Sequence, residues 1–283
     1  MTSTFSILTP SFRQLGWLRR CVRSVEDQGA VVKEHIIQDG GTGPELESSL
    51  RDRSKVSLYV EKDHGMYDAL NRALTHVTGD FFAMLNCDEQ YLPGTLDLVA
   101  QAFADHPEAD AIAGDFLVLD PDCQLIAFRK ATPPRAAMIE TDHLYTFTCA
   151  LFYRRRVLES GVRFDPTLRS IADGAWVADL LRRGHRFAIL PEYLSVFVFT
   201  GDNVSAQEIS RQEERRLRAR VPRALRLATP VLRAVRRLEK WKAGGYRSGP
   251  ISYAVFAGDD DETRTAFVAE RPDFRYPAVA GTP

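Results

Sequence analysis

The sequence predicts an α/β fold in which a mostly parallel sheet is flanked by helices. Two observations predict it. Short apolar runs alternate with helical patterns over the first 120 residues, and this alternation is typical of parallel βαβ units. In addition, a polar cluster follows each of four apolar runs. In open α/β sheets, ligands bind beyond the carboxyl ends of the strands, so these clusters are candidate parts of one site.

The strands expected in this first part are short apolar runs that end at proline, glycine or polar residues. They cover residues 5–8, 35–37, 56–60, 80–85 and 109–119. Helices are expected where apolar residues recur every three or four positions. These patterns begin at residue 15, at residue 66 and at Pro93, and proline suits a first helical turn.

The pattern changes after residue 120. Apolar runs at 125–129, 147–153, 187–190 and 194–199 predict strands, and 172–183 predicts a helix. Two basic helical stretches, 206–220 and 223–242, are interrupted near Pro222 and Pro230, because proline breaks a helix interior. We therefore expect one large domain with two halves, 1–120 and 121–205. The second half has α+β character. A basic helical extension with a glycine-rich, acidic tail follows over 206–283.

Composition excludes several classes of protein. The chain has 283 residues, of which 45% are hydrophobic and 27% charged, as in ordinary globular enzymes. No apolar run reaches the roughly 18 residues of a membrane span, and the N-terminus lacks the pattern of a secretory signal. The four cysteines form no CxxC pair. We therefore expect reduced thiols in a cytoplasmic protein, rather than a secreted, fibrous, disordered or integral-membrane one.

The charge is unevenly distributed along the chain. Residues 205–243 carry a net charge of +8, whereas the whole chain carries −1. Within 223–242, apolar residues fall at helical spacing among arginines and lysines. Such a helix suits the surface of an anionic membrane, and it equally suits packing on the acidic body or on a second subunit of a homo-oligomer. Nucleic acid is disfavoured as a partner because the body is acidic and has no recognition motif.

Two of the polar clusters suit a ligand or a metal. Asp39-Gly40-Gly41-Thr42 contains glycines that let a ligand approach the backbone; a tight turn organised by Asp39 is the alternative. Asn86-Cys87-Asp88-Glu89 offers carboxylates to Mg²⁺ or Mn²⁺, which take one or two protein carboxylates plus phosphate oxygens; a capped turn is the alternative. Neither GxGxxG nor GxxxxGK[ST] is present, which disfavours NAD enzymes and P-loop NTPases.

A third cluster opens the helix that begins near residue 66. Asp63 and Gly65 precede it, and a polar stripe with Asp68 and Asn71 lies opposite its apolar face. A solvated helix face with Asp63 as its cap is the alternative interpretation.

Together these clusters resemble a known family. The series TPSF, QDGGT, EKDHGMYDALNRAL and GDFFAMLNCDEQYLPGTL closely resembles family-two inverting glycosyltransferases of the GT-A fold, especially bacterial members that build surface polysaccharides. The likeness continues through HLYTF, FYRR, FD, AD and GDNVS, and covers about residues 4–205 in the family's order. No resemblance is evident after about residue 245.

The resemblance implies a nucleotide-sugar site in the first half. The nucleotide-facing positions that match the family are Thr9, Pro10, Ser11, Asp39, Gly40, Asp63, Gly65, Asp68, Asn71 and Asn86. Asp39 matches the residue that typically hydrogen-bonds the base, usually uracil. Asp88 matches the last aspartate of the metal-binding DxD motif, whose first position is Asn86 here. Glu89 stands where many relatives carry a further aspartate. Because the motif departs from the family's pattern at these positions, one certain carboxylate, that of Asp88, remains for Mn²⁺ or Mg²⁺.

The resemblance also assigns candidate residues to the second half. Asp173 matches the residue usually assigned as catalytic base, and the alternative is that it caps the helix. Asp142 and Asp165 are weaker alternatives for the base. His143 is a candidate acceptor-pocket residue or a structural histidine. Arg154, Arg155 and Arg156 suit either a diphosphate or a solvated helix start.

The function implied is an inverting, hexosyltransferase-like glycosyltransferase. It would move a sugar from a nucleoside-diphosphate donor, UDP-linked by analogy, to a glycan or lipid-linked acceptor during cell-surface polysaccharide synthesis. An inactive relative that acts as a binding partner is the alternative. A sugar-nucleotide pyrophosphorylase fits less well, because residues 9–12 lack a glycine-rich basic loop. The hypothesis requires Asp39, Asp88 and Asp173 to converge on one hollow.

Overall fold

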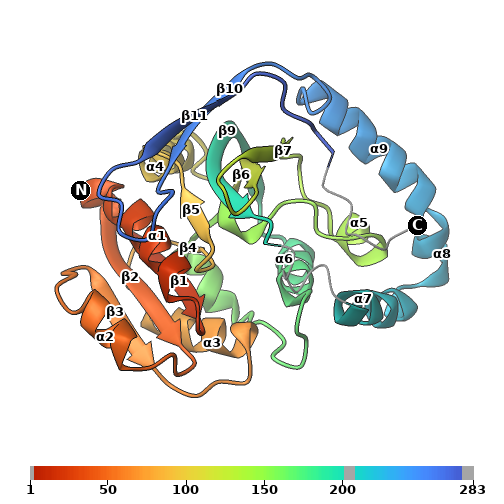
Figure 1. The fold of residues 1–283 in the computed structure, drawn as a ribbon. Coiled ribbons are helices and arrows are strands. Elements are labelled where there is room, and N and C mark those ends of the chain that lie inside the picture. Colours follow the sequence, from red (N-terminus) through yellow and green to blue (C-terminus); the bar gives the residue numbers. More distant parts are fainter. Residues whose placement is uncertain (1–2, 201–207, 276–283) are drawn as a thin grey trace.

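The structure, a computed structural model, describes residues 3–200 and 208–275. The GDNVS motif at 201–205 therefore lies outside the described residues. A nine-stranded sheet forms the centre of the fold, in the order β3-β2-β1-β4-β8-β6-β9-β5, with β7 paired to β6. Figure 1 shows this sheet between layers of helices.

The first four strands of the sheet are parallel, as predicted. They are β1 (Phe5–Ser11), β2 (Val32–Asp39), β3 (Val56–Val60) and β4 (Phe81–Met84). Every residue of β1 is buried, which is typical of a strand covered on both faces. The carboxyl ends of β1 and β2 pair side by side at Ser11 and Asp39, so the loops that follow them begin at one edge of the sheet.

Helices cover both faces of the sheet. The helices of the first half are α1 (Leu15–Glu26), α2 (Pro44–Leu50), α3 (Met66–Ala73) and α4 (Thr95–Asp105), of which α2 was not predicted. Successive side chains of β4 alternate between two core clusters: Phe81 and Ala83 pack with α1 and α4, whereas Phe82 and Met84 pack with α3. This period of two assigns α1 and α4 to one face of the sheet and α3 to the other.

The second half of the sheet is mixed rather than parallel. Its strands are β5 (Glu89–Tyr91), β6 (Ala111–Leu119), β7 (Leu125–Arg129), β8 (Leu151–Arg154) and β9 (Phe187–Val198). Strand β8 runs antiparallel to both β4 and β6. The two strands expected at 187–190 and 194–199 form the single strand β9, whose pairing with β6 shifts opposite Pro191. Proline has no N–H to donate, so a bulge there preserves the rest of the ladder.

One continuous sheet therefore joins the two proposed halves of the domain, because β4 from the first half lies beside β8 from the second. The boundaries at residues 120 and 205 stay a prediction.

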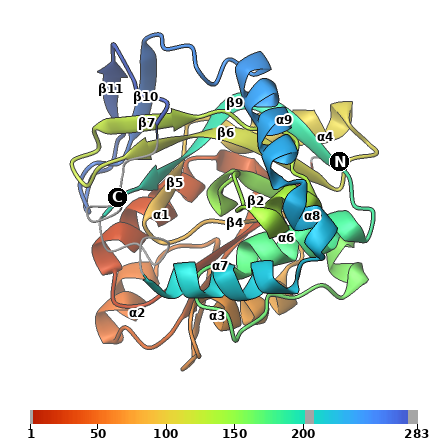
Figure 2. The same cartoon turned by 90° about the vertical axis from the view of Figure 1, so that its right-hand side faces the viewer.

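The later helices gather at the side of the sheet away from β3. They are α5 (Ala136–Thr141), α6 (Ala172–Arg182), α7 (Glu208–Arg220), α8 (Arg223–Leu227) and α9 (Thr229–Lys242). The chain breaks near Pro222 and near Pro230, as predicted: α8 ends at Leu227, and Pro230 lies in the first turn of α9. Figure 2 shows α7, α8 and α9 together on one face of the molecule. Within the described ranges, no helix has both the length and the apolar composition needed to span a bilayer.

The tail forms a β-hairpin that the sequence analysis did not predict. Strands β10 (Ile251–Val255) and β11 (Thr265–Ala269) are antiparallel and lie near α1 and β5 (Figure 1). The guanidinium of Arg264 pairs with Asp27 at 2.6 Å, and the side chain of Gln90 bonds both the N–H and the carbonyl of Phe256. These contacts attach residues 251–269 to the main domain.

Candidate active site

A cleft of about 810 Å³ opens at the carboxyl ends of the parallel strands. Its wall contains eight of the residues singled out from the sequence, namely Pro10, Ser11, Gly40, Asp63, Gly65, Asn86, Asp88 and Asp173. Pro10 and Ser11 are the last residues of β1, the next five come from loops that follow β2, β3 and β4, and Asp173 comes from α6 on the opposite side. The prediction that these loops share one edge of the sheet is therefore confirmed by their common cleft.

The loops after β1, β2 and β3 meet around Gly40. A Cβ atom on Gly40 would lie 3.2 Å from the ring of Phe12 and 3.0 Å from the carboxylate of Asp63. Both distances are tighter than ordinary carbon contacts, so a side chain at residue 40 would push these loops apart. Phe12 is exposed and lines the cleft, which offers an aromatic face at its edge.

Asp39 and Thr9 lie behind the cleft wall rather than on it. Asp39 is fully buried; its carboxylate accepts hydrogen bonds from the N–H groups of Gly41 and Thr42 at 2.8 and 2.6 Å, and from the Thr42 hydroxyl. The Thr9 hydroxyl is buried and hydrogen-bonds the ring of His35 at 2.8 Å. Of the three aspartates expected to converge, Asp88 and Asp173 line the cleft. Asp39 instead shapes the turn that carries Gly40, and its direct contact with a base stays a prediction.

The cluster around α3 divides in the same way. Asp63 accepts a hydrogen bond from the N–H of Gly65 at 2.8 Å, and both residues line the cleft. Asp68 accepts from the N–H of His64 and pairs with Arg72 at 3.0 Å. Asn71 bonds both the N–H and the carbonyl of Phe164 at 2.9 Å. Asp68 and Asn71 therefore hold the loops together and do not themselves line the cleft.

Asp88 and Glu89 bring two carboxylates to the floor of the cleft. Both line it, and Glu89 accepts a hydrogen bond from the N–H of Asn86 at 2.7 Å. Burial raises the pKa of Asp88, and burial together with the neighbouring charge of Asp88 raises the pKa of Glu89. The negative charges of Asp88 and Glu89 repel each other, and a cation beside them would relieve this repulsion. The pair therefore fits a divalent ion of the kind that completes its coordination with phosphate oxygens. Across the described part of the chain, no group of three or more histidine, cysteine or carboxylate side chains forms a metal cage.

Asp173 lies in the first turn of α6, on the far side of the cleft from β1 and β2. The hydroxyl of Thr148 donates a hydrogen bond to its carboxylate at 3.2 Å. The hydroxyl of Tyr67 lies at the same distance from the carboxylate and shares its one proton between it and the carbonyl of Ser170, which is 2.8 Å away. Burial raises its pKa, and hydrogen bonds from the backbone N–H of Gly174 and from the hydroxyls of Tyr67 and Thr148 partly offset the rise. The alternative that Asp173 caps the helix is wrong, because the N-cap position belongs to Ile171 and no side-chain cap bond forms there.

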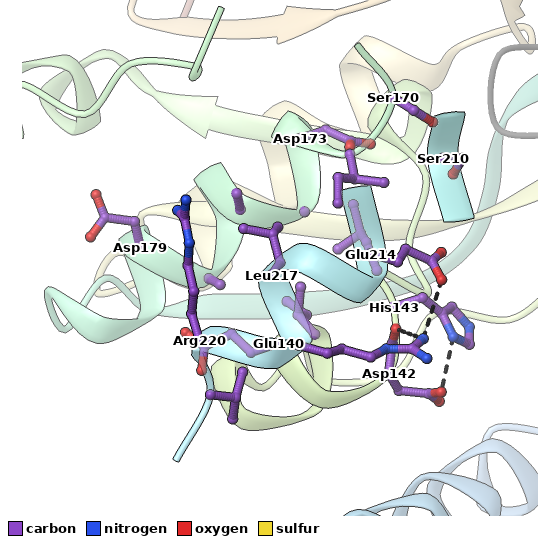
Figure 3. Close-up of a pocket in the computed structure, with 18 of the residues that line it drawn as sticks. Glu140, Asp142, His143, Ser170, Asp173, Asp179, Ser210, Glu214, Leu217 and Arg220 are labelled. Carbon is purple, nitrogen blue, oxygen red and sulfur yellow. Dashed lines mark hydrogen bonds and ion pairs between the residues drawn. The ribbon is translucent and has the colours of Figure 1, made fainter. Parts of the chain in front are cut away.

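A second cavity of about 530 Å³ adjoins the cleft at Asp173. It lies between α5, α6 and α7, and Phe147, Ser170 and Asp173 line both spaces. Figure 3 looks into this cavity, with Asp173 and Ser170 in the upper part of the view and Asp142 and His143 in the lower part. His143 thus lines the second cavity together with Asp173. A ligand in this cavity and another in the cleft could both reach the Asp173 carboxylate.

The weaker candidates for the base serve other contacts. Burial acts to raise the pKa of Asp142, but hydrogen bonds from His143 and Arg233 outweigh it and hold this pKa well below its usual range. Such a carboxylate has little affinity for a proton. Asp165 accepts bonds from the N–H and the hydroxyl of Thr167, so it shapes a turn. Neither residue has the environment of a base.

Sequence reasoning missed the cations of the cleft, Lys62 and Arg169. The guanidinium of Arg169 comes within 3.4 Å of the position of a Cβ on Gly65. Its backbone is held by α7, because the buried carboxylate of Glu213 accepts the N–H groups of Arg169 and Ser170 at 2.7 and 3.0 Å. The sequence signal was weak: a lone arginine in a loop, with its anchor 44 residues later.

The arginines 154–156, by contrast, bind carbonyls or carboxylates of the body. Arg154 bonds the carbonyls of Phe103 and Ala109, and Arg156 pairs with Asp110 at 2.7 Å. None of the three lines the cleft, so their proposed contact with a diphosphate is not supported.

Solved structures share this fold at low sequence identity. The structure of residues 1–349 of TarS from S. aureus in complex with UDP-GlcNAc matches with a TM-score of 0.62 and 15% identity, over 86% of this chain and 76% of that one. A UDP complex of the same protein matches with a TM-score of 0.59 and 16% identity, over 86% and 75% of the two chains. The GT-A-type α/β fold expected from the sequence is confirmed.

Curated relatives carry glycosyltransferase names. An uncharacterized glycosyltransferase of Mycobacterium tuberculosis is 38% identical over 109 residues, 36% of this chain and 40% of that protein. TuaG of Bacillus subtilis, assigned to teichuronic acid biosynthesis, is 23% identical over 208 residues, 72% and 82% of the two chains. The match to the M. tuberculosis relative thus spans two fifths of that protein's length. The family model described as Glycosyl transferase family 2 matches residues 6–161, which is more than half of the chain. The chain belongs to glycosyltransferase family 2.

Proposed function

We propose that this chain is an inverting glycosyltransferase that moves a sugar from a nucleoside-diphosphate donor to an acceptor hydroxyl in cell-surface polysaccharide synthesis. One observation carries the proposal: Asp173 lies where the cleft at the strand ends meets a second cavity. The cleft would hold the donor and the second cavity the acceptor, a glycan or a lipid-linked glycan. Asp173 then stands between the two reactants.

The donor is proposed to be UDP-linked. Its base would lie at Pro10, Ser11 and Phe12, where an exposed aromatic ring borders the cleft. Its diphosphate would lie nearer Asp88, with Arg169 and Lys62 as the cations of the wall. The UDP and UDP-GlcNAc complexes of TarS, a protein of the same fold, support this choice of donor.

Asp88 is proposed to hold Mn²⁺ or Mg²⁺, with Glu89 beside it and diphosphate oxygens completing the coordination. Such an ion would act as a Lewis acid and offset negative charge on the departing diphosphate. The protein would contribute the position of the carboxylates: the N–H of Asn86 fixes Glu89, and a bound cation would offset the charge that burial disfavours on Asp88 and Glu89.

Asp173 is proposed to act as the base. An acceptor hydroxyl attacks the anomeric carbon while the bond to the diphosphate oxygen breaks, and the proton of the hydroxyl passes to the Asp173 carboxylate. A single displacement inverts the anomeric configuration. The Tyr67 and Thr148 hydroxyls orient the carboxylate, and its raised pKa increases its affinity for a proton. General-base catalysis of this kind contributes roughly 10²–10⁴-fold.

Calorimetry with UDP and Mn²⁺, followed by assays of donor hydrolysis, tests the proposal. Thermal shift with UDP, GDP and dTDP sugars identifies the nucleotide, because a ligand of the native state raises its apparent stability. We expect UDP-sugars with Mn²⁺ to give the largest shift, and sugar release that depends on Asp173. Absence of nucleotide binding would end the proposal.

A catalytically inactive binding partner is the second candidate. Asn86 at the first position of the metal motif favours it, because an amide replaces a carboxylate there. Nucleotide binding without any sugar release or transfer would support this candidate over the first.

The proposed location is the cytoplasm, at the inner face of the membrane where a lipid-linked acceptor would be met. The four cysteines are free thiols, which suits a reducing compartment. A homo-oligomer is the alternative use of the basic helices.

A further inference from the structure

Among the described residues, helix α9 contacts the body along one side. On that side Arg233 pairs with Asp142 at 2.7 Å, Glu239 pairs with Arg135, and Leu232 packs against the core cluster around α6. Arg236 lies over the ring of Tyr145 and contacts the ring of His143. These contacts fix which face of α9 points away from the protein.

The opposite side of α8 and α9 presents a continuous apolar row. It consists of Leu227, Val231, Val235, Leu238 and Trp241, which are 79%, 66%, 39%, 51% and 57% exposed. The four residues of α9 recur every three or four positions and so share one face of that helix, and Leu227 precedes them at the end of α8. Of the eleven large hydrophobic side chains exposed in the described ranges, five are in this row. We call it the apolar row of α8–α9. Figure 2 shows both helices on the outside of the molecule.

Basic side chains flank the apolar row. Arg223, Arg226, Arg237 and Lys242 are exposed, and among the described residues none of them pairs with a carboxylate. The one acidic residue of 223–242, Glu239, faces the body and is bound to Arg135. The outward face is therefore apolar and cationic. Two copies meeting through this face would bring their cations together, whereas an anionic bilayer matches both the apolar row and its flanking charges.

We propose that the apolar row of α8–α9 docks on the surface of an anionic lipid bilayer. The helices lie in the plane of the interface, with the row buried among acyl chains and the arginines and lysine at the headgroups.

The docked orientation also concerns the second cavity. Val221 and Pro222, which connect α7 to α8, line that cavity, so its rim continues into the docking face. Resting on the proposed function, this places the acceptor cavity next to the membrane and favours an acceptor whose glycan is carried on a lipid.

Co-sedimentation with phosphatidylcholine vesicles, with and without phosphatidylglycerol, tests the docking. We expect binding that requires phosphatidylglycerol and weakens with salt. Leu238→Glu should lower the partition coefficient about tenfold or more, and Arg237→Glu about fivefold. The matched control is Leu98→Glu, since Leu98 is an exposed leucine of α4 at 42% exposure; it should bind like the wild type. Equal binding by Leu238→Glu and Leu98→Glu, or no binding to anionic vesicles, would overturn the proposal.

Analytical ultracentrifugation of the same variants tests whether the apolar row instead binds a second copy of the chain. A dimer that Leu238→Glu dissociates, without vesicle binding by the wild type, would assign the row to a second copy. UDP binding by each variant reports on the donor cleft independently. If the wild type releases sugar but does not bind anionic vesicles, this inference is refuted and the proposed function stands. If the wild type binds the vesicles but binds no nucleotide, the proposed function is refuted and the docking stands.

Discussion

The two walls of the cleft are positioned by different means. The strand-end wall, residues 10–12, 14, 40, 62–65 and 86–89, lies at the carboxyl ends of β1 to β4, so each side chain is placed within a few residues of a strand end. The helix wall, residues 147–148 and 164–173, depends on contacts with distant segments: Glu213 of α7 holds the N–H groups of Arg169 and Ser170. A substitution in the strand-end wall should therefore affect only the contacts of that residue, whereas a substitution behind the helix wall should displace the loop that it holds.

The largest expected effect is at Asp173, where the cleft and the second cavity meet. Asp173→Asn keeps the size of the side chain and removes its ability to accept a proton. We expect the transfer rate to fall roughly 10²–10⁴-fold while UDP affinity in calorimetry stays unchanged, because the strand-end wall is intact.

Asp179→Asn is the matched control for this variant. Asp179 belongs to the same helix and lines the second cavity, but it is partly exposed and pairs with Arg183. At saturating acceptor it should transfer sugar at nearly the wild-type rate. Near-normal turnover of Asp173→Asn would contradict the assignment of the base.

The next effect concerns the hold of α7 on the helix wall. Glu213→Ala leaves two N–H groups without their charged acceptor, so we expect the free energy of unfolding to fall by about 2–3 kcal/mol. For a chain of this size the melting temperature should drop roughly 5–10 °C, and the KM for donor should rise because the loop carrying Arg169 is released. Glu214→Ala, which removes only a partly exposed pair with Arg218, should change stability by less than about 1 kcal/mol. Equal melting temperatures for the two variants would show that Glu213 does not hold the loop.

Arg169 itself tests whether the helix wall contributes to donor binding. Its guanidinium lies beside Gly65 in the cleft, so Arg169→Ala should weaken UDP binding about tenfold, less so at high salt. Arg163→Ala is the control, because its guanidinium bonds a backbone carbonyl and does not line the cleft. If both variants bind UDP equally, the diphosphate lies elsewhere along the wall.

The same contrast explains how far the sequence could predict the site. Strand ends are local signals, so the positions of Gly40, Asp63 and Asp88 in one cleft followed from the alternation of strands and helices. Which of these side chains face the cleft was harder to predict. Asp39 turns back to its own loop, as in the tight-turn alternative, because the N–H groups of Gly41 and Thr42 are within reach. Asn71, by contrast, is satisfied by Phe164, 93 residues away, and no local pattern predicts that contact.

The fold shows the same limit. The first four strands and their order of appearance were predictable, whereas the direction of β8 depends on pairing with strands from distant parts of the chain. The hairpin of β10 and β11 did carry a local signal, since Ile251, Tyr253 and Val255 alternate with smaller residues. The glycine-rich, acidic composition around it obscured that pattern, and its attachment through Arg264 to Asp27 could not be read from spacing.

The smallest expected effect is on the pH dependence of the transfer rate, which depends on the proton affinity of Asp173. The base must be ionised to accept a proton, and burial raises its pKa. The transfer rate should therefore fall as pH decreases through a range above that of an ordinary aspartate. The Thr148 hydroxyl donates to the carboxylate and stabilises its ionised form, so Thr148→Val should raise the pKa of Asp173 further. Its rate should be about two- to fivefold lower than wild type on the acidic side and approach wild type at high pH, as measured in rate–pH profiles with saturating donor. Profiles that differ from wild type by the same factor at every pH would instead assign Thr148 to substrate positioning. Thr146→Val is the control: the hydroxyl of Thr146 does not bond Asp173, so its loss should leave the shape of the profile unchanged.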